Sequence, residues 1–179
     1  VPFPRSARSA SAVLAGAPTK PPPPLACPPG LEKHGDEPFQ GYEVWCEKKD
    51  VAGNGRREGP SRLYYDDGGL WQEAVWKDGK RDGPFVEYHR NGVKAREGRY
   101  AADAMEGPWT FRRDSGLLEE EAEFRAGVPH GRFVAYGPSG RKLTEGQRCL
   151  GAPCGLWRTW SDDGRLEGEV RYETPVVVP

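Results

Sequence analysis

One glutamate recurs every 24 residues through the last two-thirds of this 179-residue chain. Carboxylates serve as general acids, general bases and metal ligands, so such a row is the first candidate for chemistry. The five copies are Glu73, Glu97, Glu121, Glu145 and Glu169. On successive β-hairpins, adjacent copies lie two strands apart, about 9–10 Å. That is too far for a retaining carboxylate pair or a shared metal ion, so we expect a structural row. Its expected partners are turn donors and the arginines Arg62, Arg96 and Arg158.

No other residues group into a catalytic motif. The histidines His34, His89 and His130 are scattered along the chain, and no Ser/His/Asp set can be nominated from their spacing. No phosphate-binding or dinucleotide-binding loop is present, and the many glycines recur with turns. The sequence therefore predicts a protein that is not an enzyme and binds no cofactor or metal ion.

The four cysteines form two local pairs, Cys27 with Cys46 and Cys149 with Cys154. The second pair flanks a short loop between repeats, where its members come within disulfide reach. A bridge in the first pair would pin the entry segment onto the open edge of the sheet. Two local pairs favour disulfides and an oxidising compartment, and the absence of a Cys-x-x-Cys pair disfavours zinc. Four reduced thiols in a cytosolic protein are the alternative.

The glutamates sit in a repeat that two glycines punctuate. The first glycine opens each copy at Gly59, Gly83, Gly107, Gly131 and Gly155, and the second follows nine residues later. The second glycine ends pairs such as Asn91-Gly92, a strong hairpin signal between apolar runs. Each copy therefore predicts two strands. The first follows the opening glycine, and a looser polar loop, such as 77–82, leads to the next copy.

Pairing the strands across a two-residue turn sorts the aromatic residues onto two faces. One row should face small residues or the opening glycines and form the structural core: Phe85, Trp109, Phe133, Trp157, Trp76, Tyr100, Phe124 and Tyr172. A second row has the opposite parity, lies near the glutamates and is the candidate interaction face: Tyr64, Tyr88, Tyr136 and Trp160. A longer turn with a bulge would change this assignment.

These residues carry a family resemblance. Residues 83–92 read Gly-Pro-Phe-x-x-Tyr-x-x-Asn-Gly, and Glu-Gly-x-Tyr follows at 97–100. The pattern resembles a MORN repeat, and most closely the bacterial variant found in antitoxin-annotated proteins. The resemblance implies an all-β fold, an elongated single-layer antiparallel β-meander of tandem 24-residue β-hairpins. Members of the family are mostly scaffolds and binding modules, some dimerise, and lipid binding has been proposed.

The chain is expected to divide into four parts. Residues 1–30 are a Pro-rich tether or a processed leader remnant, and 31–58 an entry segment with a half-repeat strand at 42–47. The five repeats occupy 59–173, as 59–82, 83–106, 107–130, 131–154 and 155–173. A tail follows at 174–179. We expect about eleven short strands and essentially no helix.

The charge distribution and the hydropathy of the sequence argue against nucleic acid as a partner and against a membrane-spanning helix. The 26 basic and 27 acidic residues are interspersed and form no basic stripe for nucleic acid, and no apolar run is long enough for a membrane helix. We therefore expect a non-enzymatic protein-interaction or scaffold module in a bacterial envelope or secreted protein, with an unidentified protein partner. Self-association through the sheet edges is a second mode. The alternatives are a cytoplasmic antitoxin-like protein that neutralises a toxin, and peripheral lipid binding.

Overall fold

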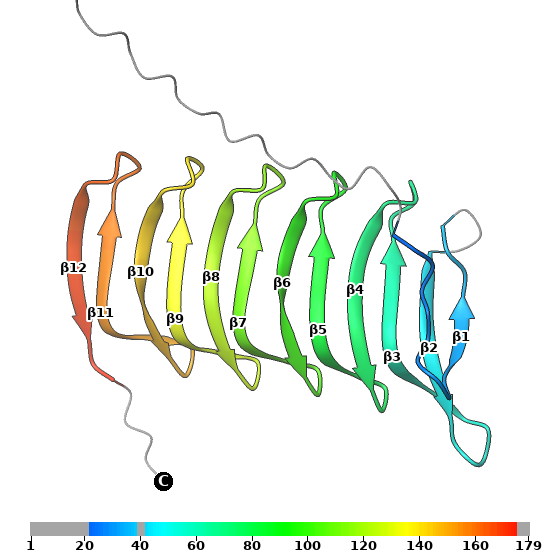
Figure 1. Cartoon of the computed structure of the whole chain (residues 1–179). Coiled ribbons are helices and arrows are strands. Elements are labelled where there is room, and N and C mark those ends of the chain that lie inside the picture. Colours follow the sequence, from blue (N-terminus) through cyan, green and yellow to red (C-terminus); the bar gives the residue numbers. More distant parts are fainter. Residues whose placement is uncertain (1–21, 39–41, 175–179) are drawn as a thin grey trace, which may run out of the picture.

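The computed structural model describes residues 22–38 and 42–174, which form one antiparallel sheet of twelve strands in chain order (Figure 1). The strands are β1 (Glu32–Gly35), β2 (Glu43–Lys49), β3 (Gly55–Tyr64), β4 (Leu70–Lys77), β5 (Lys80–Tyr88), β6 (Lys94–Ala101), β7 (Ala104–Arg112), β8 (Leu118–Arg125), β9 (Val128–Tyr136), β10 (Lys142–Cys149), β11 (Ala152–Trp160) and β12 (Leu166–Tyr172). The all-β meander predicted from the repeat is confirmed. β1 is the strand beyond the expected eleven. The described residues contain no helix of the length and apolarity that crossing a membrane requires.

Each hairpin turns through a three-residue loop rather than the predicted two-residue turn. In the second repeat the His89 amide donates to the Val93 carbonyl, and Gly92 closes the loop with a φ of 78°. A bulge follows at once, because Tyr88 pairs with Lys94 while Glu87 pairs with Arg96. The bulge residue offsets the extra loop residue. The predicted register therefore holds, and Phe85 faces Gly98.

The connections between repeats are tight turns, so the expected looser loop at 77–82 is wrong. Lys77 pairs with Lys80, and the two residues between them, Asp78 and Gly79, have φ angles of 50° and 79°. Two consecutive positive φ angles are the geometry that suits the twist of a two-residue hairpin. The strands consequently run through the opening glycines, and β5 begins three residues before Gly83.

Large and small side chains alternate across one face of the sheet, which we call the aromatic face. Its central row, one residue per strand from β3 to β12, is Ser61, Ala74, Phe85, Gly98, Trp109, Ala122, Phe133, Gly146, Trp157 and Val170. Phe85 and Trp109 are each 1% exposed. A Cβ added at Gly98 would lie 2.3 Å from the Trp109 ring, whereas alanine precedes each phenylalanine. Alanine thus matches phenylalanine, and glycine matches the wider tryptophan.

The aromatic residues that end the second strands pack beside this row. Tyr100 is buried against Phe85 and Trp109, and the Arg81 guanidinium lies 4.1 Å from the centre of its ring. Trp76 and Phe124 are half-buried against the same cluster. Tyr172 is 42% exposed, because it lies on the last described strand. The burial of these aromatic residues therefore decreases toward the end of the array.

Opposite its predicted partner Phe124, Gly107 is constrained by its backbone rather than by packing. An added Cβ at Gly107 would meet no atom within 4 Å, but φ is 70°. A small side chain at residue 107 would therefore not overpack the sheet. The penalty for substitution comes from the left-handed backbone conformation.

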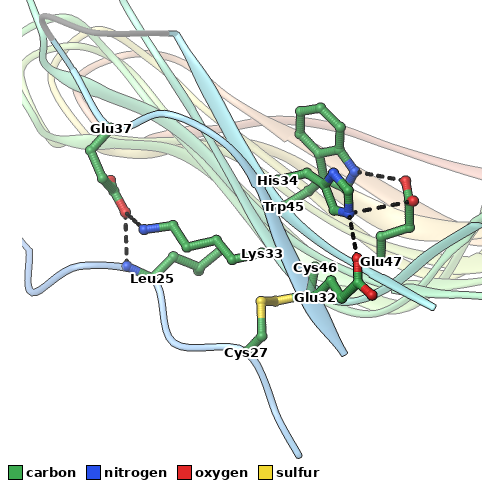
Figure 2. Close-up of a disulfide and its surroundings, with 9 residues drawn as sticks. All are labelled: Leu25, Cys27, Glu32, Lys33, His34, Glu37, Trp45, Cys46 and Glu47. Atoms are coloured by element: carbon green, nitrogen blue, oxygen red, sulfur yellow. Dashed lines mark hydrogen bonds and ion pairs between the residues drawn. A yellow bond between two sulfur atoms is a disulfide. The ribbon is translucent and has the colours of Figure 1, made fainter. Parts of the chain in front are cut away.

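The entry segment lies over β2 and β3, whereas the open edge at this end of the sheet is β1. The expected tether or leader remnant lies outside the described residues as far as residue 21, and from Pro23 the chain contacts β2 and β3. We call residues 22–31 the strap. Cys27 is joined to Cys46 of β2 by a disulfide, with Cα atoms 5.6 Å apart (Figure 2). Leu25 is buried with Val44 and Tyr64, so the bridge holds a small apolar cluster under the strap.

The second disulfide joins Cys149 to Cys154 across the Leu150–Gly151 turn between β10 and β11. Cys149 pairs with Ala152 in the ladder, and Cys154 pairs with Gln147, so the bridge links two residues that are two positions apart in register. Both disulfides join the pairs that the cysteine spacing predicts.

Candidate interaction surface

The five repeated glutamates project from the second strand of each hairpin onto the face opposite the aromatic face. We call this the glutamate–tyrosine face. Its glutamate side chains are between 28% and 44% exposed. They lie on β4, β6, β8, β10 and β12, so the row crosses the sheet from the first hairpin to the last strand.

The residue fifteen positions after each of the first four glutamates lies next to that glutamate or to its partner. The Tyr88 hydroxyl donates to Glu73 at 2.9 Å, and the Tyr136 hydroxyl donates to Glu121 at 2.8 Å. Arg112 interrupts the aromatic row, and its guanidinium lies 3.9 Å from Glu97. A tyrosine hydroxyl and an arginine thus fill the same role in different repeats.

In the fourth repeat, a lysine rather than a tyrosine or an arginine contacts the repeated glutamate. The Lys142 ammonium donates to Glu145 at 2.5 Å and lies 5.4 Å from the centre of the Trp160 ring. Trp160 therefore meets the carboxylate through a lysine rather than directly. The second aromatic row lies on this face, as its parity predicts. Its members from Tyr88 onward are half-buried rather than fully exposed.

Arginines complete the row. Arg62 donates to Glu73 at 3.0 Å, and Arg158 donates to Glu169 at 2.6 Å, as expected. Arg96 does not join them. It is adjacent to Glu97 in β6 and so points to the aromatic face, where it donates to Glu87 at 2.6 Å. The expectation that Arg96 pairs with a repeated glutamate is wrong, because its side chain lies on the other face.

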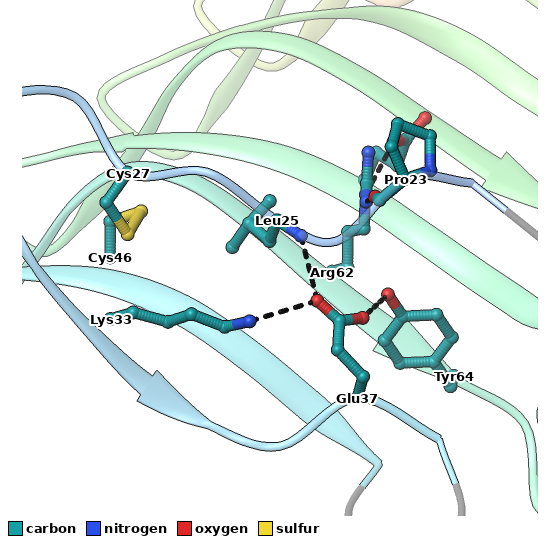
Figure 3. Close-up of polar contacts among 9 residues, drawn as sticks. Pro23, Leu25, Cys27, Lys33, Glu37, Cys46, Arg62 and Tyr64 are labelled. Carbon is teal, nitrogen blue, oxygen red and sulfur yellow. Dashed lines mark hydrogen bonds and ion pairs between the residues drawn. A yellow bond between two sulfur atoms is a disulfide. The ribbon is translucent and has the colours of Figure 1, made fainter.

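Tyr64 does not belong to an exposed surface. Its side chain is 6% exposed, it packs with Leu25, and its hydroxyl donates to the Glu37 carboxylate (Figure 3). Glu37 also accepts the Leu25 amide at 2.8 Å, and Arg62 donates to the Pro23 carbonyl at 2.5 Å. The strap thus covers Tyr64, which was expected on the candidate interaction face. The candidate face therefore begins at Tyr88.

Hydrogen bonds lower the pKa of two carboxylates in the row, Glu121 and Glu145. The Tyr136 hydroxyl, with help from the Arg132 guanidinium, holds the pKa of Glu121 below its ordinary value. Burial raises the pKa of the Tyr88 hydroxyl, and the bond to Glu73 adds to the rise. Such groups are fixed hydrogen-bond partners at neutral pH rather than proton carriers.

Two shallow hollows lie on the glutamate–tyrosine face. The first has a volume of about 220 Å³ and borders the strap at Leu25. Its floor includes Pro60, Val75, Pro84 and Val86, so it is mostly apolar. The second has a volume of about 350 Å³ over β9–β11, and its lining includes Arg132, Glu145, Leu156 and Arg158. One end of the face is therefore apolar and the other charged.

The histidines lie in separate environments. His34 stacks on Trp45 with ring centres 5.7 Å apart, His89 Nε2 lies 2.8 Å from the Arg112 carbonyl, and His130 accepts the Leu150 amide. Within residues 22–38 and 42–174, no three metal-ligating side chains gather in one place. The predicted absence of enzymatic activity stays a prediction.

Residues 57–78 match a MORN repeat variant. The matched segment covers most of β3, its turn and β4, which is the first complete hairpin of the array. A hairpin with the same glycine and glutamate spacing recurs with a 24-residue period through the strands that follow the matched segment. A search of curated proteins found no match to the chain.

Removing one hydroxyl tests the coupling between tyrosine and glutamate. Tyr136→Phe keeps the ring and deletes the donor to Glu121, so we expect the free energy of unfolding to fall by about 1 kcal/mol at neutral pH. Because the pKa of Glu121 is lowered in the folded state, this contribution is present above its ordinary pKa and disappears as the pH falls through the folded value. Urea melts should therefore show a difference between the two proteins that shrinks in acid. Tyr172→Phe, at an exposed ring, is the control. A difference that grows in acid contradicts the coupling.

Proposed function

We propose that the chain is a non-enzymatic protein-interaction module whose binding surface is the glutamate–tyrosine face from Tyr88 to Trp160. One observation carries the proposal: ion pairs and hydrogen bonds fix the aromatic and charged side chains of this face in successive repeats. Side chains held before binding lose less conformational entropy when a partner arrives. Tyrosine, tryptophan and arginine are also the residues that most often anchor protein interfaces.

The shape of the sheet supports the same conclusion. No second sheet or helix covers this face in the part of the chain that the structure describes (Figure 1). Repeat arrays of this kind expose long surfaces and commonly use them for binding. The two hollows give the face relief, with an apolar site near β3–β5 and a charged site near β9–β11.

The two disulfides support placement in an oxidising compartment. We therefore propose an envelope or secreted setting, in a bacterium as the resemblance to the bacterial MORN variant suggests. The partner would then be another envelope or extracellular protein.

The test uses two double variants on the binding face and one on the opposite face. We expect Tyr88→Ala with Tyr136→Ala, and separately Arg132→Ala with Arg158→Ala, to lose partners captured from the source organism by the tagged protein. Glu87→Ala with Arg96→Ala removes an ion pair from the aromatic face and should capture them normally. Melting temperatures of all variants separate lost binding from lost folding.

Three outcomes contradict the proposal. Full capture by both binding-face variants means that the interface lies elsewhere. Capture lost by the aromatic-face variant alone assigns binding to the opposite face. Binding of anionic liposomes that depends on Arg132 and Arg158, with no captured protein, indicates a lipid ligand instead. A captured toxin whose activity the chain blocks would support the antitoxin alternative.

A further inference from the structure

The last strand of the sheet is an open edge with apolar side chains. No described strand pairs with the outer side of β12, and edges of this kind offer unpaired backbone groups to another chain. Val170 is 54% exposed, and Tyr172 is 42% exposed. The opposite edge differs, since β1 has only four residues and carries the Glu32–Lys49 ion pair at 2.7 Å. β12 is thus the edge better suited to pairing.

Val170 prevents the sheet from continuing with another repeat of the same kind. At the equivalent positions of the earlier hairpins stand Ala74, Gly98, Ala122 and Gly146, and each lies beside the aromatic residue of the next strand. Gly98 has no room even for a Cβ beside Trp109. Valine is larger than either glycine or alanine, so an incoming aromatic residue in the repeat register would clash with it. A head-to-tail extension is therefore disfavoured.

We propose that β12 pairs antiparallel with β12 of a second copy of the chain, about a two-fold axis at Val170. In this register the two Val170 side chains face each other on the aromatic face. Tyr172 faces Gly168 of the second copy, which repeats the large-against-small rule of the sheet. On the other face, Arg171 faces Glu169 of the second copy, and symmetry produces this pair twice. All three contacts are favourable cross-strand pairs.

Neighbouring registers lack this complementarity. An axis at Glu169 sets two glutamates opposite each other, and its opposite-charge pairs, Arg171 with Glu167 of the second copy, fall at the bulge of β12. An axis at Gly168 sets Glu167 against Glu169 twice. An axis at Arg171 opposes two arginines. Like charges directly opposite each other destabilise a strand pair. A bulge at Glu167 interrupts β12 between the pairs of Gly168 and Leu166 with β11, so the five residues after the bulge, Gly168 to Tyr172, define the contact.

The test is sedimentation of the whole chain over a wide range of concentration. We expect a reversible dimer for the native protein. Arg171→Glu and Glu169→Arg each place like charges opposite each other twice, so each should raise the dimer dissociation constant about tenfold or more. Mixing the two variants restores both opposite-charge pairs and should give a heterodimer. Arg125→Glu, an exposed charge reversal on β8, should leave the native dimer unchanged.

A cross-link tests the axis itself. Val170→Cys puts two thiols face to face at cross-strand distance, so it should form a disulfide-linked dimer, whereas Val128→Cys at another exposed position should not. A native protein that stays monomeric at every concentration overturns the proposal. So does a dimer that both charge variants retain, or a mixture of them that gains no heterodimer.

Discussion

Gly98→Val is expected to lower the free energy of unfolding by about 3 kcal/mol, at the upper end of the usual cost of overpacking. The Cβ alone would lie 2.3 Å from the ring of Trp109, and valine adds two methyl groups beyond it. Trp109 is 1% exposed and contacts Phe85, Tyr100 and Phe124, so it has no space into which to move. Urea melts of the native protein and the variant measure the difference.

The pairing of small and aromatic residues gives this prediction a matched control. Gly98→Ala should destabilise the sheet, and Trp109→Phe in the same chain should recover part of that loss, because alanine already lies beside phenylalanine at Ala74–Phe85 and Ala122–Phe133. A double-mutant cycle measures the interaction between the two sites. Additive losses in the cycle would show that Trp109 is not what excludes a side chain at residue 98.

Removing the Cys27–Cys46 disulfide is expected to cost about 3 kcal/mol in the chain-entropy model. Its cysteines are 19 residues apart, and the bridge holds Leu25 and the strap over Val44 and Tyr64. Cys27→Ser with Cys46→Ser should therefore lower the melting temperature and free the strap. Protease digestion near Leu25 reports the second effect directly.

The other disulfide is the control for this effect. Cys149 and Cys154 are five residues apart, so the same model assigns their bridge about 2 kcal/mol. Cys149→Ser with Cys154→Ser should thus be the milder change and should leave the strap protected. Equal losses, or a strap that stays protected without its own disulfide, would mean that the strap is held by packing alone.

The 24-residue period predicts the hairpins, their order and their register, because each of these follows from local glycine and aromatic spacing. The facing of Phe85 and Gly98 was predictable even though the turn is longer than expected, since the bulge before Arg96 restores the register. The tight Asp78–Gly79 turn was missed. Asp-Gly is a favoured pair for a two-residue turn, but the equivalent turn in the next repeat is Ala102–Asp103, so no glycine marks this position in every repeat, and the polar stretch 77–82 does not show where the strands end.

The candidate surface was partly predictable. The parity of Tyr88 and Tyr136 relative to Phe85 places them beside the glutamates, and the structure adds the hydrogen bonds that join them. The burial of Tyr64 depends on residues distant in sequence, Leu25 and Glu37, which no repeat pattern connects to it. The role of Arg112 was hidden because it differs in type from the tyrosines that it replaces.

Site-specific photo-cross-linking tests the proposed binding surface most directly. A photoreactive residue replaces Thr110 or Pro84 on the glutamate–tyrosine face, or Thr159 or Glu87 on the aromatic face, and the protein is irradiated with its captured partner. The interaction-surface proposal predicts adducts with a protein partner from the first two positions and none from the second two. Adducts confined to Thr159 and Glu87 would contradict it.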